Sequence, residues 1–356
     1  NSWFVFNVMQ VGGYKPATII DFEIPAKYGL KQTIGDTIGI GGIMRGLRTI
    51  PVIEEIILEI EEVCPNVLFL NYVNPMAIVS GYMQRFLNVN TIGLCHSVQV
   101  CVRDLLKGVG MEEYYDDHYE LIAGINHMAW LLKIADSKGR DLYPEIKKRA
   151  LIINKMYKHQ DMVRFKMLEC FGFYCTESSL HNAEYTPYFI KSNNLKLIED
   201  YRISINEYIN RCEQNIIKWD NKLKDVKLER SLEYGISIIE AILEKKDYSF
   251  SGNVINKGSI LNLPEDSCIE VPCEVKNGRI EKNFIGMLPM QLAALNMTNI
   301  NVQLLTIEAA RSRKKEDIYY AAMLDPHTSA ELSLDQIVKM CDELIEAHKG
   351  YMSMYH

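Results

Sequence analysis

The chain has 356 residues, a formal net charge of −7, 48% hydrophobic residues and 24% charged residues. This composition predicts a soluble protein with one large domain or two, and with a sizeable core. It has no block of basic residues that would bind a phosphate backbone, so we expect no nucleic acid as a partner. It has no apolar run of the roughly 18 residues that a membrane span needs, so we expect no membrane as a partner. Nine scattered cysteines and a beginning without a signal-peptide pattern predict reduced thiols in the cytoplasm.

The first 115 residues alternate between short apolar strands and helices. We expect strands at residues 3–11, 67–70 and 91–94, and helices at 48–63, 76–87 and 98–107. Residues 14–47, rich in Gly and Ile, are predicted to form a long functional loop with a short helix. The alternation favours an α/β fold with a Rossmann-like parallel sheet of the lactate/malate dehydrogenase type over residues 1–115.

Polar residues follow each predicted strand of this sheet. They are residues 10–13, residues 71–74, and the pair Cys95 and His96. Ligands of parallel sheets bind beyond the carboxyl ends of the strands, so we expect these three groups to converge on one site.

Residues 116–356 have a different pattern, which predicts an α+β domain that carries catalytic residues and the oligomer surface. Strands at 119–123 and 129–134 flank residues 124–127, and several short strands are expected within 252–273. Helices are expected at 145–170, 288–323 and 332–349, and long charged helices at 194–245.

Cys95 and His127 are the first candidates for chemistry. Considered alone, Cys95 has three interpretations: a metal ligand, a nucleophile or an inert buried thiol. A single histidine in a loop, such as His127, is most often structural. Taken together, they suggest a thiolate–imidazole metal site with open positions, which is the arrangement of a catalytic metal centre.

Asn74 and Tyr185 are weaker candidates. An Asn-Pro pair after a strand presents its amide to the nicotinamide ribose in lactate and malate dehydrogenases, although a plain turn explains it equally well. A tyrosine has a pKa of about 10 and acts as a base only if cations stabilise its phenolate; otherwise it is a core aromatic. The sequence contains no GxGxxG, P-loop, serine elbow or HExxH motif.

Several longer strings resemble family 4 of the glycoside hydrolases, and most closely its α-galactosidase branch. The strings are residues 10–16, 21–23, 41–51, 71–77, 93–99, 123–129, 176–187, 299–303 and 323–328. They extend over nearly the whole chain. His96 follows the cysteine where branches that act on phosphorylated sugars have an acidic residue. The family opens with a strand, a Gly-rich loop and a helix that hold pyrophosphate, and we expect that segment to be missing here.

The resemblance implies hydrolysis of α-galactosides with NAD and a divalent metal such as Mn²⁺. The sugar is oxidised at C3, its C2 proton is removed, the C1–O bond is eliminated, and water addition and return of the hydride complete the cycle. The implied metal ligands are Cys95 and His127. Tyr185 is implied as the base and His96 as the acid, and Gln10, Gly12 and Asn74 as NAD-binding residues.

The resemblance also implies residues around the sugar and a quaternary state. Asn74, Asn126, His181, Glu184 and Arg48 are expected to bind the substrate, and Arg45 and Arg48 either line the pocket or lie on the surface. The expected assembly is a homodimer or homotetramer. Three alternatives remain: α-glucosidase or α-glucuronidase activity on the same scaffold, a lactate/malate-type dehydrogenase, and an inactive truncated homologue.

Overall fold

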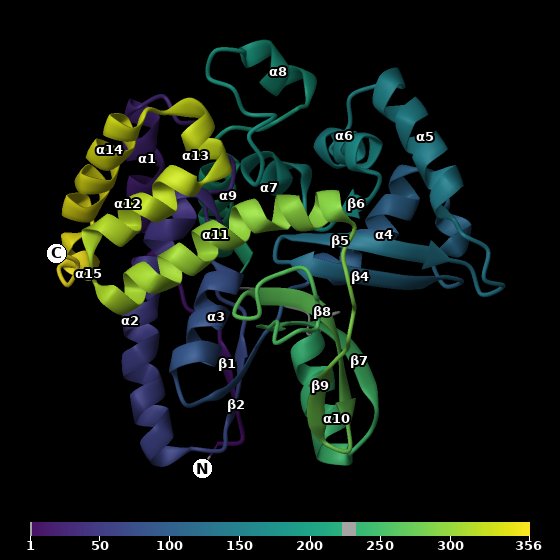
Figure 1. Cartoon of the computed structure of the whole chain (residues 1–356), viewed down its shortest axis with the longest axis horizontal. Helices are drawn as coiled ribbons and strands as arrows, with labels where there is room; N and C mark the ends of the chain where they lie inside the picture. The colour runs from purple at the N-terminus through teal and green to yellow at the C-terminus, as the bar shows by residue number, and fades with distance from the viewer. Residues whose placement is uncertain (1, 223–232) are drawn as a thin grey trace.

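The computed structural model describes residues 2–222 and 233–356. Its described strands form a nine-stranded sheet in the order β1-β2-β3-β7-β8-β4-β5-β6, with β9 beside β8. Helices cover this sheet, and α11 crosses the middle of the molecule in front of it (Figure 1). The fold therefore combines a parallel Rossmann-like part with an antiparallel part, as the sequence predicted.

The parallel part consists of β1 (Phe4–Asn7), β2 (Leu68–Asn71) and β3 (Asn90–Gly93). Leu68 pairs with Phe4 on one side and with Asn90 on the other. The connecting helices are α2 (Gly39–Val63) and α3 (Met76–Phe86). All four residues of β2 are buried, which explains why Leu68, Phe69 and Leu70 form a continuous apolar run rather than an alternating pattern.

The prediction of a long loop with a short helix over residues 14–47 is only partly correct, because residues 28–38 are irregular but most of the segment is helical. The segment holds a short irregular helical turn, η1 (Gly13–Thr18), then α1 (Ile19–Lys27) and the first turns of α2. The glycines that suggested a loop instead allow close packing. A Cβ on Gly41 would lie 2.3 Å from the Gly35 carbonyl oxygen, and one on Gly42 would lie 2.6 Å from the Thr37 carbonyl carbon. Tertiary packing thus outweighs the low helix propensity of glycine.

The antiparallel part follows α4 (Ser97–Gly108) and the short turn η2 (Glu112–Tyr114). Its strands are β4 (Tyr119–Ile125), β5 (Met128–Ala135), β6 (Tyr174–Cys175), β7 (Tyr248–Ile255), β8 (Cys268–Lys276) and β9 (Arg279–Lys282). The several short strands predicted within 252–273 are instead parts of the long β7–β8 pair. Gly93 of β3 pairs with Asn253 of β7, so the sheet continues across the predicted domain boundary at residue 115.

The remaining helices surround this sheet. They are α5 (Tyr143–Met156), α6 (Met162–Phe171), α7 (Ser179–Glu184), α8 (Leu195–Asp200), α9 (Glu207–Lys222), α10 (Tyr234–Glu244), α11 (Met290–Ser312), α12 (Lys315–Leu324), α13 (Pro326–Glu331), α14 (Leu334–Ala347) and α15 (Lys349–Met352). The charged helices predicted at 194–245 correspond to α8, α9 and α10, and residues 223–232 of that range lie outside the described residues.

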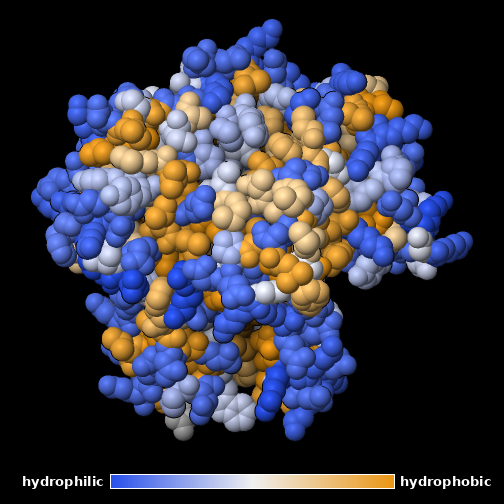
Figure 2. All heavy atoms as spheres, viewed as in Figure 1, coloured by the Kyte–Doolittle hydropathy of each residue, from blue (hydrophilic) through white to orange (hydrophobic). Residues whose placement is uncertain are grey.

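The face shown in Figure 2 is hydrophilic over much of its outline, with apolar side chains gathered across its centre and in further areas at the upper left and in the lower part. Exposed apolar side chains near the start of α11 are Leu261, Phe284, Met287 and Met290. Leu261 donates its main-chain N–H to the Gly286 carbonyl, so the two segments that carry these residues lie side by side. Within the described ranges, every helix is too short or too polar to cross a membrane.

Candidate functional site

A cavity of about 660 Å³ lies at the carboxyl ends of β1, β2 and β3. The predicted site residues on its wall are Gln10, Asn74, Cys95, His96, His127 and His181. Tyr14, Asp36, Tyr72, Glu177, Tyr208 and Glu233 also line it. The predicted convergence of three strand ends on one site is therefore confirmed.

Cys95 and His127 meet at the floor of this cavity. Cys95 follows β3, and His127 lies in the turn between β4 and β5, so two parts of the sheet bring them together. The Cys95 Sγ and the His127 Nε2 are 3.2 Å apart, and both residues are buried. Burial raises the pKa of the Cys95 thiol, while hydrogen bonds with Ser97 act in the opposite direction. A bound dication would favour the thiolate, because its charge outweighs the cost of burial.

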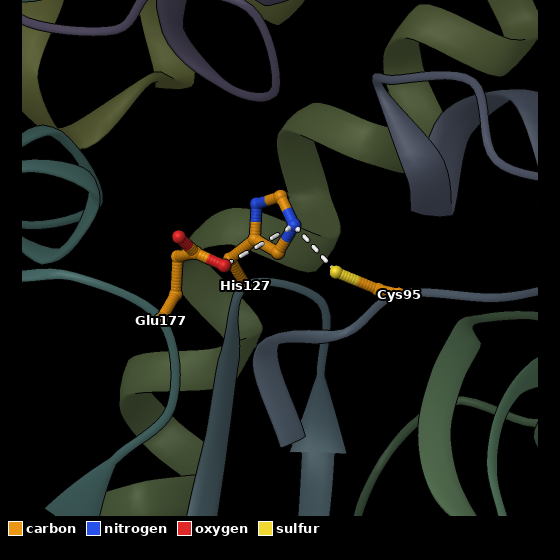
Figure 3. Close-up of side chains that lie close together, drawn as sticks. All are labelled: Cys95, His127 and Glu177. Atoms are coloured by element: carbon orange, nitrogen blue, oxygen red, sulfur yellow. Dashed lines mark hydrogen bonds and ion pairs between the residues drawn. The ribbon is translucent and has the colours of Figure 1, made fainter. Parts of the chain in front are cut away.

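Glu177 is the third member of this cluster, and the sequence had not singled it out. Its carboxylate Oε2 lies 3.8 Å from the His127 Nε2, and its Oε1 lies 3.4 Å from the His181 Nδ1. Figure 3 shows the side chains of Cys95, His127 and Glu177 pointing toward one another from three segments. Burial alone would raise the pKa of Glu177, but the charges of His181 and His127 lower it below its usual value. This environment favours the ionised carboxylate, which is the form that binds a cation.

A second carboxylate, Asp36, lies on the other side of His181. Its Oδ1 is 3.8 Å from the His181 Nε2, and its Oδ2 accepts a hydrogen bond of 3.1 Å from the Asn74 amide. Arg45 is buried behind it, with Nη1 3.7 Å from Oδ2, and its Nε donates to the Asn74 carbonyl. Burial opposes ionisation of Asp36, but His181 and Arg45 hold its pKa well below the usual range. Arg45 is thus neither a surface cation nor a group on the cavity wall.

The donor set fits a divalent transition metal. Thiolate and imidazole ligands suit the later metals, and an added carboxylate favours harder ions such as Mn²⁺. The ligand atoms of Cys95, His127 and Glu177 all lie within 4.8 Å of one another. The cavity beside them is bounded by Gln10 and Asn74, at the strand ends where a parallel sheet receives a dinucleotide.

Sequence comparisons give the family. A sequence profile described as family 4 glycosyl hydrolase matches residues 1–111, and one described as the C-terminal domain of family 4 glycosyl hydrolase matches residues 122–328. An α-galactosidase of Bacillus subtilis (strain 168) is 56% identical over 361 residues, covering 100% of this chain and 83% of that protein. The chain belongs to family 4 of the glycosyl hydrolases.

Other relatives agree with this membership. An α-galactosidase of Rhizobium meliloti (strain 1021) is 30% identical over 99% of this chain and 74% of its own length. The crystal structure of a putative glucosidase from Bacillus subtilis has a TM-score of 0.86 at 24% identity, covering 96% of this chain and 83% of that one, and so shares the fold. Family membership replaces the alternative of a lactate/malate-type dehydrogenase.

The structure does not bring the Tyr185 hydroxyl into the cavity of this family 4 protein. Tyr185 is 1% exposed, accepts a hydrogen bond of 2.9 Å from the His127 main-chain N–H, and donates one of 3.2 Å to the Asn126 carbonyl. Burial raises its pKa well above the usual value. This geometry suits a residue that holds the His127 loop and argues against the predicted role of Tyr185 as base.

Asn126 also lies beneath the site rather than in it. Its side chain is buried and donates to the Glu270 carboxylate, as Asn253 does. Burial raises the pKa of Glu270. The predicted contact of Asn126 with substrate is therefore replaced by a contact that supports the turn carrying His127.

Glu184 and Arg48 were predicted to bind substrate, and both are instead buried in structural contacts. The Glu184 carboxylate accepts hydrogen bonds from the main-chain N–H groups of Thr33, Ile34 and Gly35, which fixes the segment that leads to Asp36. Arg48 forms a bidentate ion pair with Asp21, at 3.1 and 2.6 Å. Sequence spacing could not separate Glu184 from the cavity residue His181, because both lie in the string at residues 176–187.

Gly12 is tightly packed against its neighbours, whereas the side chain of His96 is exposed. Gly12 has φ +80°, and a Cβ there would lie 2.5 Å from the Ala17 Cβ, so this position requires glycine for packing at the entrance to η1. The His96 side chain is 65% exposed, with its Nδ1 3.8 Å from the Glu233 carboxylate. His96 is accessible to a substrate.

A second cavity, of about 680 Å³, adjoins the first. The two share His96 and Glu177, and the second is otherwise lined by polar residues that include Ser97, Asp104, Lys107, Lys158 and Arg202. The arrangement offers a sugar site in the first cavity and room for a polar group beyond it.

Proposed function

We propose that this chain hydrolyses α-galactosides in a reaction that depends on NAD and a divalent metal. The observation that carries the proposal is the Cys95–His127 pair at the floor of a cavity on the strand ends, in a chain 56% identical to a protein named α-galactosidase. The structure of a 6-phospho-β-glucosidase from Thermotoga maritima contains manganese and NAD⁺, which supports the same cofactors here.

Cys95 and His127 would hold the metal. Gln10 and Asn74 on the cavity wall, and Gly12 two residues after Gln10, are the proposed contacts of NAD. When bound, the metal supplies a Lewis acid that polarises sugar oxygens, and NAD accepts and returns a hydride. The Asn74 amide lies on the cavity wall and is oriented by Asp36, so it offers directed hydrogen bonds to hydroxyl groups.

His181 and Asp36 bind and orient the sugar in this proposal. Both line the cavity, and each has charged neighbours that fix its position. Hydroxyl groups need both donors and acceptors, and an imidazole beside a carboxylate provides both.

His96 is the proposed proton donor to the leaving oxygen. It lies between the two cavities, where the bond between the sugar and its leaving group would be. An imidazolium is suited to donate a proton near neutral pH.

We further propose that the protein acts in the cytoplasm as a homodimer or homotetramer. All nine cysteines are free thiols, which suits a reducing compartment. The exposed apolar residues Leu261, Phe284, Met287 and Met290 lie on adjacent segments and offer a surface for a second copy.

The test is hydrolysis of p-nitrophenyl α-galactoside with and without NAD⁺, Mn²⁺ and a reductant. The corresponding α-glucoside and α-glucuronide separate the sibling specificities. We expect cleavage of the α-galactoside that requires both NAD⁺ and metal. Cleavage that is independent of NAD⁺ would refute the mechanism, and failure to cleave any glycoside would favour the inactive homologue.

A further inference from the structure

We propose that Glu177 is a third protein ligand of the metal, beside Cys95 and His127. This inference rests on the metal requirement in the proposed function and deepens it. The pair Cys95 and His127 alone leaves most positions of a metal to water and substrate. A carboxylate ligand would give the protein a metal site formed by three side chains of its own.

The spacing of the donor atoms fits a single ion. Metal–ligand bonds of about 2.0–2.3 Å place neighbouring ligand atoms roughly 3–4 Å apart. The Cys95 Sγ and the His127 Nε2 are 3.2 Å apart, and the His127 Nε2 and the Glu177 Oε2 are 3.8 Å apart. The three ligand atoms stay within 4.8 Å of one another, so one ion reaches all of them after small side-chain movements.

The fold places Glu177 there by specific contacts. β6 pairs with β5 through Cys175 and Trp130, and the Thr176 N–H then donates to the Ala129 carbonyl, two residues after His127. Glu177 follows with φ +66°, which is uncommon for a residue with a side chain and costs conformational energy. Ser178 next caps α7. The unfavourable φ turns the Glu177 side chain toward His127 before the helix begins.

The two carboxylate oxygens of Glu177 face different partners. Oε1 lies toward the His181 Nδ1, and Oε2 lies toward the His127 Nε2. His181 is thus placed as an outer partner that orients the carboxylate, as the neighbours of metal-binding carboxylates do. Asp36 is already engaged by Asn74 and Arg45, so it is less suited to the role.

Charge balance supports the same assignment. A buried dication with one thiolate leaves a net positive charge, which is costly to bury. The Cys95 thiolate and the Glu177 carboxylate together neutralise it. Because carboxylate oxygen is a harder donor than sulfur, Glu177 also explains how a site with a cysteine would accept Mn²⁺.

The experiment measures Mn²⁺ binding to the metal-depleted full chain under reductant, without NAD⁺ or sugar. Free Mn²⁺ is followed by electron paramagnetic resonance, with titration calorimetry in parallel. Glu177→Gln removes the charge at constant shape, and Glu177→Asp keeps the charge on a shorter side chain. Glu120→Gln is the matched control, because Glu120 also pairs with a histidine, His118 at 3.1 Å, away from the cavity.

We expect Glu177→Gln to weaken Mn²⁺ binding by at least about tenfold, Glu177→Asp to weaken it less, and Glu120→Gln to stay within about twofold. In the Co²⁺-loaded protein, Glu177→Gln should change the visible ligand-field bands and leave the thiolate-to-metal absorption in place. Equal Mn²⁺ affinity in the parent and Glu177→Gln would overturn the proposal and leave the two-ligand metal site intact. If the parent itself binds no Mn²⁺, the metal requirement of the proposed function fails as well.

Discussion

The molecule contains two buried clusters of charged and polar groups that look alike in composition and differ in position. One is Cys95, His127 and Glu177, which lines the main cavity. The other is Asp21, Arg48 and His348, in which the Asp21 carboxylate is bonded to Arg48 and lies 2.8 Å from the His348 Nε2. Asp21, Arg48 and His348 are all buried, whereas the Glu177 side chain of the first cluster is 20% exposed. The second cluster packs α1, α2 and the C-terminal helices together and lines neither of the two cavities described above.

The difference shows that buried charged groups can have two roles, either to stabilise packing or to bind a ligand. In the Asp21 cluster the groups satisfy one another, since Arg48 also donates from its Nε to the Val11 carbonyl. In the cluster of Cys95, His127 and Glu177, the thiol, the imidazole and the carboxylate face one another across a space that an ion fits. Charges that are fully paired stabilise a packing arrangement, and charges that leave room for a ligand point to function. Substitutions in the two clusters should therefore affect different properties.

The largest expected effect is a loss of activity when a residue of the cluster of Cys95, His127 and Glu177 is replaced. Cys95→Ala should reduce hydrolysis of the α-galactoside by at least about a thousandfold, because a metal contributes several kcal/mol to the transition state. Its unfolding midpoint in urea should remain close to that of the parent. Steady-state rates at saturating Mn²⁺ and a urea titration check the two parts. Retained activity would mean that Cys95 is an inert thiol and would remove the contrast between the clusters.

The next largest effect concerns stability in the other cluster. Asp21→Asn leaves the buried Arg48 guanidinium without its counter-charge, so we expect a loss of about 3–5 kcal/mol in the free energy of unfolding. Urea unfolding monitored by circular dichroism measures it. Glu343→Gln is the control, since Glu343 forms an exposed ion pair with Lys27 on the same helices and should change stability little. A small effect of Asp21→Asn would show that this cluster is not structural.

A smaller effect is expected at Glu184, which belongs to neither cluster but supports the Asp36 wall. Glu184→Gln replaces one acceptor oxygen by an N–H donor that faces main-chain N–H groups. We expect the free energy of unfolding to fall by about 1–3 kcal/mol. Displacement of the segment before Asp36 should raise the KM for the galactoside more than it lowers kcat. A normal KM in a destabilised variant would restrict Glu184 to a purely structural role.

The smallest effect is a pH dependence that Asp36 contributes. The folded-state pKa of Asp36 is held well below its usual value, so its ionised form stabilises the fold. That stabilisation is fully present above the unfolded pKa of about 3.9 and is lost as the pH falls toward the folded pKa. Between about pH 5 and pH 2 the parent should therefore lose more stability than Asp36→Asn. Parallel curves for the two proteins would show that Asp36 is not paired in solution.

The family, the Rossmann-like strands and six residues of the cavity wall could be predicted from the amino-acid sequence. Buried parallel strands are continuous apolar runs, and the groups that follow them must meet at one edge of the sheet, so Gln10, Asn74, Cys95 and His96 were predictable from order alone. His127 came from its place in the loop between two predicted strands, and His181 came from the family string that contains it.

Which polar residues of those strings face the cavity could not be predicted, because it depends on packing between segments that are distant in the sequence. Glu177 and Glu184 lie in one string seven residues apart, yet the first reaches the metal pair and the second caps a main-chain turn. The directions of these two side chains depend on the backbone φ of Glu177, on where Thr176 joins β5 and on how α2 packs. All three are set by contacts between residues that are distant in the sequence. Likewise Tyr185 lies in the same string as His181, but packing pairs its hydroxyl with the Asn126–His127 peptide. Packing also pairs Arg48 with Asp21. Periodicity and motif spacing report which residues lie near one another, whereas side-chain direction is decided by the folded neighbours.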